Sequence, residues 1–277
     1  MKSTFLTLFI TVIAFQLSAQ YYYKDILVPV QTAQQFQNQK ARKVKTVKLS
    51  SYEYTNEPTE GFEAEQTFEN NYAGVRTYTK SPASGESLLK TNFTPDGKLL
   101  STVDTTDGAS STNTYLYDLD NRLTRITNIS ISNGQSKEKE EHFWYYAADG
   151  KPERMIKVKN DRDTTYIEFG RDEKGNIGEE RVVRKRTALG TTYYYYNDNN
   201  QLTDIVRYNQ KAGRLLPDFM FEYDDKNRVS TMLVVPEGSN EYMKWRYTYD
   251  DKGLKTKETC FNRRNQLLGR IEYKYEF

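Results

Sequence analysis

The chain has 277 residues, with 40 Lys and Arg and 38 Asp and Glu spread along its length. This even mixture of charges argues against a dedicated nucleic-acid surface, which would gather Lys and Arg on one face. One cysteine, Cys260, cannot form an internal disulfide, and one histidine with one cysteine does not make a zinc site, so we expect neither a metal nor another cofactor.

The first residues predict a signal peptide. A basic start at Lys2 is followed by an apolar run from Phe5 to Phe15 and by small residues at Ser18 and Ala19. This order is typical of a secretory leader, here residues 1–19, and the run is too short for a comfortable membrane span. We therefore expect an exported protein, periplasmic, secreted or at the cell surface, with no transmembrane helix after cleavage.

Residues 20–43 predict an extended lead-in and one short helix. Pro29 argues against a helix through Gln20–Val30. Gln31–Lys43 has a helical composition, with Thr32 as a candidate cap. We expect this helix to cover an open end or edge of a sheet, as repeat proteins commonly require.

Residues 44–90 alternate as strands but lack the repeated phrase that follows them. Val44–Tyr54, Phe62–Phe68 and Val75–Tyr78 are the expected strands. No linker separates them from the rest, so we treat this stretch as a divergent start of the same sheet.

From residue 91 to 277 one phrase recurs, most clearly at Phe221–Val229. Two aromatic residues two apart share one strand face, and Asp224 to Asn227 provides turn chemistry before Val229 starts a returning strand. Each copy is therefore a predicted β-hairpin. The second aromatic residue anchors each copy, and these anchors are Phe93, Tyr117, Tyr146, Tyr196, Tyr223, Tyr249 and Phe261.

A degraded copy has Arg171 at the anchor, so anchors recur about every 25 residues until Phe261, which follows Tyr249 after only 12. Beyond each turn, apolar residues such as Leu202 and Ile205 are three apart. A β-bulge would be needed to place both on one face.

The repeat resembles the YD-repeat family, also called the Rhs type, of bacterial exported proteins. The matches are best at Tyr117-Asp118 with Asn121, Tyr223-Asp224 with Asn227, and Tyr249-Asp250 with Gly253. The resemblance covers roughly Thr91 to Phe277 and implies an antiparallel β-strip that twists or curls; it does not imply an enzyme. We therefore expect an all-β fold of tandem antiparallel hairpins in a long twisted or curled sheet, and whether the sheet closes is left open.

One strand face of the repeats is consistently aromatic and is expected to form the core. The residues two before the anchors are Tyr115, Trp144, Phe169, Tyr194, Phe221 and Tyr247. Tyr145, Tyr193 and Tyr195 lie on the opposite face, where aromatic rings could stack against sugars, so they are the candidate ligand-binding residues.

These features favour an exported, non-catalytic binding or scaffold module, with a polysaccharide or another surface protein as the partner classes considered. The first alternative is an outer-membrane barrel, because Ile271, Tyr273, Tyr275 and Phe277 alternate like a closing barrel strand. The second is a hydrolase using His142, which no nucleophile motif supports. No catalytic residue is assigned.

Overall fold

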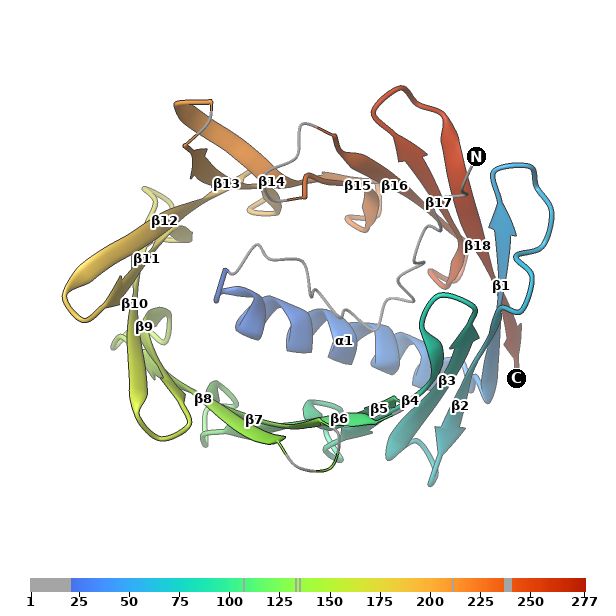
Figure 1. Ribbon diagram of the computed structural model, residues 1–277, viewed down its shortest axis with the longest axis horizontal. Helices are drawn as coiled ribbons and strands as arrows, with labels where there is room; N and C mark the ends of the chain where they lie inside the picture. Colours follow the sequence, from blue (N-terminus) through green and yellow to red (C-terminus); the bar gives the residue numbers. More distant parts are fainter. Residues whose placement is uncertain (1–20, 107, 133, 135, 211, 237–240) are drawn as a thin grey trace.

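The chain forms a closed β-barrel with one helix lying across its interior (Figure 1). The computed structural model describes residues 21–277 except 107, 133, 135, 211 and 237–240. Within these residues the elements are α1 (Lys24–Ala41), β1 (Thr46–Glu53), β2 (Glu63–Glu69), β3 (Gly74–Ser81), β4 (Gly85–Phe93), β5 (Leu99–Thr106), β6 (Ala109–Tyr117), β7 (Leu123–Ser132), β8 (Ser136–Tyr146), β9 (Pro152–Lys159), β10 (Asp163–Arg171), β11 (Ile177–Arg184), β12 (Thr187–Tyr196), β13 (Leu202–Asn209), β14 (Arg214–Tyr223), β15 (Val229–Val234), β16 (Met243–Tyr249), β17 (Lys255–Asn262) and β18 (Leu267–Glu276).

The sheet closes through its first strand. Each strand pairs antiparallel with the next along the chain, and β1 pairs with both β2 and β18. Val47 faces Gln66 on one side and Tyr275 on the other. The all-β fold of antiparallel hairpins is confirmed, but the strip is closed rather than open, so neither of its edges is left unpaired.

The repeated phrase forms a hairpin whose turn needs a left-handed residue. The Asn or Gly four residues after each anchor has a positive φ in every copy, for example 64° at Asn121, 61° at Asn227 and 80° at Gly253. In the Asp224 copy, the carboxylate accepts the backbone N–H groups of Lys226 and Arg228 at 3.0 and 2.9 Å. The Asp is therefore required as a hydrogen-bond acceptor, whereas the Asn or Gly is required because it adopts the left-handed backbone conformation.

A β-bulge follows each of these turns, as the spacing of apolar residues required. Tyr196 pairs with Leu202 and Tyr195 pairs with Asp204, so Thr203 has no partner in the ladder. The Thr203 hydroxyl donates to the Tyr195 carbonyl at 3.2 Å. Leu202 and Ile205 can consequently both face the barrel interior, or lumen.

The anchor tyrosines connect successive hairpins. The Tyr223 hydroxyl donates to the carbonyl of Leu202 at 2.7 Å, and the Tyr249 hydroxyl donates to that of Val229 at 2.8 Å. Tyr117, Tyr146 and Tyr196 make the same bond to Leu99, Leu123 and Ile177. A phenol at this position therefore satisfies a carbonyl beside the preceding bulge, which explains why the repeat favours Tyr over Phe.

Three anchors depart from this scheme. Phe93 has no hydroxyl, and its ring stacks on Phe36 of α1. Arg171 has no hydroxyl and instead pairs with Asp149 in the preceding turn. Phe261 is the second-last residue of β17, whereas the other anchors end even-numbered strands. Its turn therefore lies at the opposite end of the barrel, and its ring lies outward beneath Arg246. Tyr275 on β18 makes the anchor bond instead, to the Lys255 carbonyl at 2.7 Å. Phe261 therefore keeps the turn of the repeat, with φ 56° at Asn265 and a bulge after Leu267, but it is not in line with the other anchors, because a spacing of 12 residues spans one strand rather than two.

The aromatic face of the repeats is the inner face of the barrel. Trp144 and Tyr194 are 3% exposed, and Phe169 is also buried. Tyr115, Phe221 and Tyr247 pack against the same cluster. The predicted core is therefore confirmed in these residues.

The helix is longer than predicted and begins earlier. It starts at Lys24, and Pro29 lies inside it, so the expectation of an extended Gln20–Val30 is wrong, as is Thr32 as a cap. Pro29 removes one backbone hydrogen bond in the second turn. Tyr22, Ile26 and Leu27 pack against the barrel's inner aromatic cluster, and this burial offsets the missing bond.

No helix in the described part of the chain is long and apolar enough to cross a membrane. The predicted signal peptide, residues 1–19, lies outside the described residues.

Candidate functional site

The lumen is crossed by α1, which is held at both ends. Near its C-terminal end, Phe36 stacks on Phe93 with ring centroids 3.7 Å apart. Asn38 donates to the Gly253 carbonyl at 3.0 Å and Gln37 donates to the Asp96 carbonyl at 3.2 Å, both in repeat turns. The helix therefore lies close to the barrel end formed by the repeat turns.

A buried polar network holds the other end of the helix. Asp25 accepts from His142 Nδ1 at 2.5 Å and from Trp144 Nε1 at 3.3 Å. The other ring nitrogen of His142 bonds to Glu140 at 2.9 Å, and Lys157 pairs with Glu140 at 2.8 Å. Both nitrogens of His142 are therefore engaged inside the barrel.

Glu180 receives the N-terminal end of the helix. Its carboxylate accepts the N–H of Tyr22 at 2.8 Å, the N–H of Tyr23 at 2.9 Å and the hydroxyl of Tyr194 at 2.8 Å. A carboxylate in this place also interacts favourably with the helix dipole. We call Glu180 and its three donors the helix latch.

Burial and pairing shift the pKa values of these groups. Burial raises the pKa of Glu180 to about 7, although its three donors oppose the shift. Burial also opposes the charge of His142, yet Asp25 and Glu140 raise its pKa to about 9. Burial acts against Glu140 too, but His142 and Lys157 lower its pKa to about 2. His142 is therefore a paired cation at neutral pH and not a free base.

The three candidate tyrosines do not form one site. Tyr145 on β8 and Tyr195 on β12 are 39% and 48% exposed on the outer face, with Tyr193 half-buried beside Tyr195. Strands β9, β10 and β11 lie between β8 and β12. At about 4.8 Å per strand, Tyr145 is too distant to share a sugar-sized groove with the other two. Tyr145 instead lies beneath the Arg154 guanidinium, 4.6 Å from its ring centroid.

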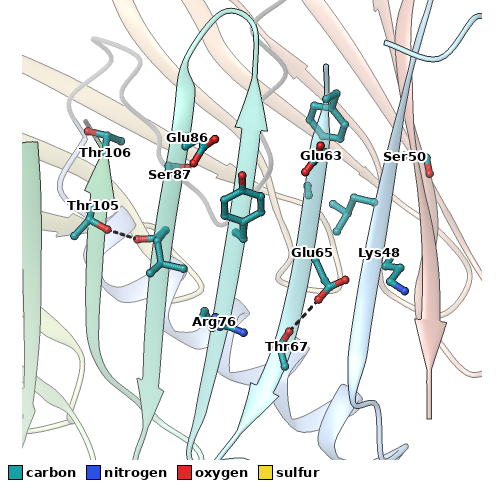
Figure 2. Close-up of a pocket in the computed structure, with 15 residues that line it drawn as sticks. Lys48, Ser50, Glu63, Glu65, Thr67, Arg76, Glu86, Ser87, Thr105 and Thr106 are labelled. Carbon is teal, nitrogen blue, oxygen red and sulfur yellow. Dashed lines mark hydrogen bonds between the residues drawn. The ribbon is translucent and has the colours of Figure 1, made fainter. Parts of the chain in front are cut away.

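A groove lies elsewhere, over the outer face of β1 to β5, and Figure 2 shows its lining. It has a volume of about 860 Å³. This outer groove is lined by Lys48, Leu49, Ser50, Phe62, Glu63, Ala64, Glu65, Thr67, Arg76, Tyr78, Glu86, Ser87, Leu88, Thr105 and Thr106.

The charges of the outer groove are unevenly paired. Lys48 pairs with Glu276 and Arg76 pairs with Glu69, each at 3.0 Å and each with a carboxylate that does not line the groove. Glu65 accepts only a long bond from the Thr67 hydroxyl at 3.4 Å, and among the described residues no cation lies within ion-pair distance of Glu63 or Glu65. Lys48 opposite Glu65 and Lys80 opposite Glu63 interact with these carboxylates at longer range. The groove therefore offers two carboxylates outside close ion pairs, and Glu65 lies opposite Tyr78.

Sequence reasoning missed both the outer groove and the helix latch. The groove lies in residues 44–106, mostly in the stretch that was treated only as a divergent start of the sheet. The missing repeat motif in this stretch could have indicated a site, because strands that do not have to keep the motif can carry side chains of other types. The latch had no local signal, because Glu180 and Tyr22 are 158 residues apart. Among the described residues no cluster of three or more His, Cys, Asp or Glu could hold a metal ion.

Comparisons with known proteins give distant structural similarity only. No protein-family model matches the sequence, and no curated protein matches it. The chain is similar to a crystal structure of TcdB2-TccC3-Cdc42, with 14% identity over 77% of this chain and a TM-score of 0.36. It spans only 12% of that chain's length.

A porin-like protein from Bacteroides uniformis ATCC 8492 is also similar, with 11% identity, a TM-score of 0.43 and coverage of 84% of this chain and 96% of that one. A porin-like protein from Bacteroides vulgatus ATCC 8482 gives 12% identity, 84% and 98% coverage, and a TM-score of 0.28. At these TM-scores the similarities carry no argument about function.

Proposed function

We propose that this chain is an exported, non-catalytic binding protein whose barrel works in an aqueous compartment and takes its ligand in the outer groove. The charged outer face of the barrel is the observation that carries this proposal. Around the β1–β18 seam the outward positions include Lys48, Glu65, Lys257, Glu272 and Lys274, which face one another across strands.

The outer face of β8 to β11 also lacks a tall apolar band. On β8 to β11, Phe143, Ile156, Tyr166 and Val183 form one outward row across neighbouring strands. The next row toward the repeat turns contains Arg154, Glu168 and Arg181. A lipid-facing barrel needs an apolar band about 25 Å tall, and one row of side chains supplies only a fraction of that height.

Because α1 lies in the lumen, we place the ligand on the outer face of the barrel. A barrel of this strand number is wide enough for a channel, but α1 crosses the interior and is bonded to its wall (Figure 1). The outer groove has a volume of about 860 Å³, and its carboxylates Glu63 and Glu65 can accept hydrogen bonds from hydroxyl groups. Tyr78 adds a ring on which a sugar can stack. We therefore propose a neutral, hydroxyl-rich ligand, with an oligosaccharide as the best-fitting class.

The test is calorimetric titration of residues 20–277 with neutral oligosaccharides, comparing wild type with Glu65→Gln and Tyr78→Ala. We expect a saturable heat of binding that Glu65→Gln weakens, because a hydrogen bond to a charged carboxylate contributes about 1.5–3 kcal/mol, more than one to a neutral amide oxygen. Glu168→Gln is the matched control, since Glu168 is an exposed outward carboxylate on the distant strand β10. A titration that is unchanged in both groove variants would refute the groove as the site.

An outer-membrane barrel is the second candidate function. The closed barrel is the part of this hypothesis that the structure shows, and an even number of antiparallel strands is typical of such barrels. Membrane fractionation and heat-modifiable migration on gels would support it. A mature chain that is folded and monodisperse without detergent would exclude it, and the charged outer face leads us to expect that result.

The proposal of a non-catalytic role is supported by the position of His142. Its side chain is 12% exposed, and both ring nitrogens are bonded to carboxylates in the lumen. We further propose that the chain is a divergent member of the YD-repeat family, because the Tyr, Asp and Asn or Gly of its phrase each have a distinct role in the hairpins. Export through the leader accords with both proposals.

A further inference from the structure

A second hollow lies at the end of the barrel where the repeat turns are. It is lined by Arg42, Lys43, Lys45, Tyr72, Lys252 and Phe277 and has a volume of about 610 Å³. These residues come from the end of α1, the start of β1, the β2–β3 turn, the β16–β17 turn and the end of β18. We call it the basic hollow, because four of its six lining residues are cationic and none is acidic.

The cations of this hollow are not neutralised by acidic side chains. Some basic side chains elsewhere on the barrel lie within ion-pair distance of a carboxylate, as Lys80 does of Glu86 at 3.0 Å. Within the described residues, no such pair involves the four cations of the hollow. Lys45 donates at 3.2 Å to the main-chain oxygen of Phe277, which in a chain of residues 20–277 belongs to the terminal carboxylate and offsets the charge of Lys45. Arg42 donates to the Asn38 side chain at 3.2 Å. Lys43 and Lys252 are exposed.

A simpler role for these cations would be to compensate the C-terminus of α1, where basic residues are favourable. The backbone already provides that compensation. The N–H groups of Arg42, Lys43 and Val44 donate to the carbonyls of Gln39, Lys40 and Gln39 at 3.2, 3.0 and 3.1 Å. Lys252 comes from a different part of the chain and belongs to no helix. Helix termination therefore does not explain why the four cations converge.

The two aromatic residues of the hollow give it a second property. Tyr72 and Phe277 line it together with the cations, and the Lys252 ammonium lies 5.8 Å from the Phe277 ring centroid. Rings beside the exposed cations Lys43 and Lys252 suit a ligand that has both an acidic group and a flat or ring-shaped body.

We propose that the basic hollow binds an acidic group carried on a sugar ring, as in a uronate oligosaccharide. This site is independent of the outer groove. The cations would bind the carboxylate and the aromatic residues would contact the ring.

The test is calorimetric titration of residues 20–277 with trigalacturonate, in wild type and in Lys43→Glu/Lys252→Glu. We expect saturable binding that weakens at higher ionic strength, and a loss of affinity of about tenfold or more in the double variant, because two attractive charges become repulsive. Lys226→Glu is the matched control. Lys226 occupies the same position in the neighbouring repeat turn as Lys252, is exposed, and is not part of the hollow.

Three outcomes would overturn the proposal. The first is that trigalacturonate does not bind, and the second is that wild type and the double variant bind it equally well. The third is that inorganic phosphate binds as tightly as trigalacturonate, which would show that the sugar ring contributes nothing. Circular dichroism and thermal unfolding establish that each variant is folded. Glu65→Gln and Tyr78→Ala must leave trigalacturonate binding unchanged, so failure of the outer groove and failure of the basic hollow are distinguished.

Discussion

Replacing Glu180 by Leu tests whether the helix latch stabilises the barrel. Glu180 is fully buried, and its carboxylate is the acceptor for Tyr22 N–H, Tyr23 N–H and the Tyr194 hydroxyl. Leu has a similar size but accepts no hydrogen bond, so three buried donors lose their acceptor. Each unsatisfied donor costs about 1–3 kcal/mol, and the apolar burial of Leu offsets part of the total.

We therefore expect Glu180→Leu to lower the free energy of unfolding by about 3 kcal/mol. For a chain of this size, that loss lowers Tm by roughly 6–12 °C. The emission of Trp144 and Trp245 is a suitable probe, because both side chains lie in the lumen, 3% and 7% exposed. Hydrogen exchange of the α1 amides provides a second readout, and we expect those amides to lose protection first.

The matched control is Glu168→Leu, on β10 next to β11. Glu168 is exposed on the outer face, so we expect a change within about 0.5 kcal/mol. The reasoning would be refuted if the free energy of unfolding of Glu180→Leu were within about 1 kcal/mol of the wild-type value and its α1 amides were still protected from hydrogen exchange. That result would mean that ring packing alone holds the helix.

Four further predictions concern the pH dependence of Glu180 and of His142, the hydroxyl bonds of the anchor tyrosines, and the buried thiol. Glu180 has a folded pKa of about 7, above its unfolded value. Its contribution to the free energy of unfolding is therefore present below the unfolded pKa and is lost as pH rises through 7. Glu180→Gln should flatten this part of the plot of unfolding free energy, measured in urea, against pH. The same sign applies to His142, whose pKa is about 9, so its contribution to stability is present below about pH 6.5 and is lost toward pH 9. An unfolding free energy of the wild type that rises over this pH range, relative to that of His142→Gln, would contradict this. Tyr223→Phe should lower the free energy of unfolding in urea by about 1 kcal/mol, because it removes the hydrogen bond to the Leu202 carbonyl. An unchanged urea midpoint would show that this bond does not stabilise the barrel. Cys260 is fully buried and burial raises its pKa to about 12, so a thiol reagent should modify it in the unfolded chain but not in the native one.

The hairpin repeat could be predicted because its causes are local. A turn of five residues needs its own Asp and its own left-handed Asn or Gly, and the alternation around Tyr223 determines which side chains share a face. The aromatic core followed from the same alternation. The period of about 25 residues also fits the position of Tyr275, which is 26 residues after Tyr249 and makes the same kind of bond.

The start of α1 could not be predicted from local sequence, because propensity at Pro29 opposed it. Helix formation there depends on burial against residues of β8 to β14, and on Glu180, which is 158 residues from Tyr22. The outer groove was missed for a related reason. Its residues have no motif of their own and come together only when β1 to β5 lie side by side.

The sequence by itself determined the strands, the turns and the inward aromatic face, since each depends on residues within one hairpin. Only the tertiary structure decided that the strip closes, that a helix crosses its lumen and that the outer face is charged all around the seam. Closure depends on Val47 meeting Tyr275 across the whole length of the chain. That contact results from the accumulated twist and stagger of every strand between them, and no single repeat contains that information.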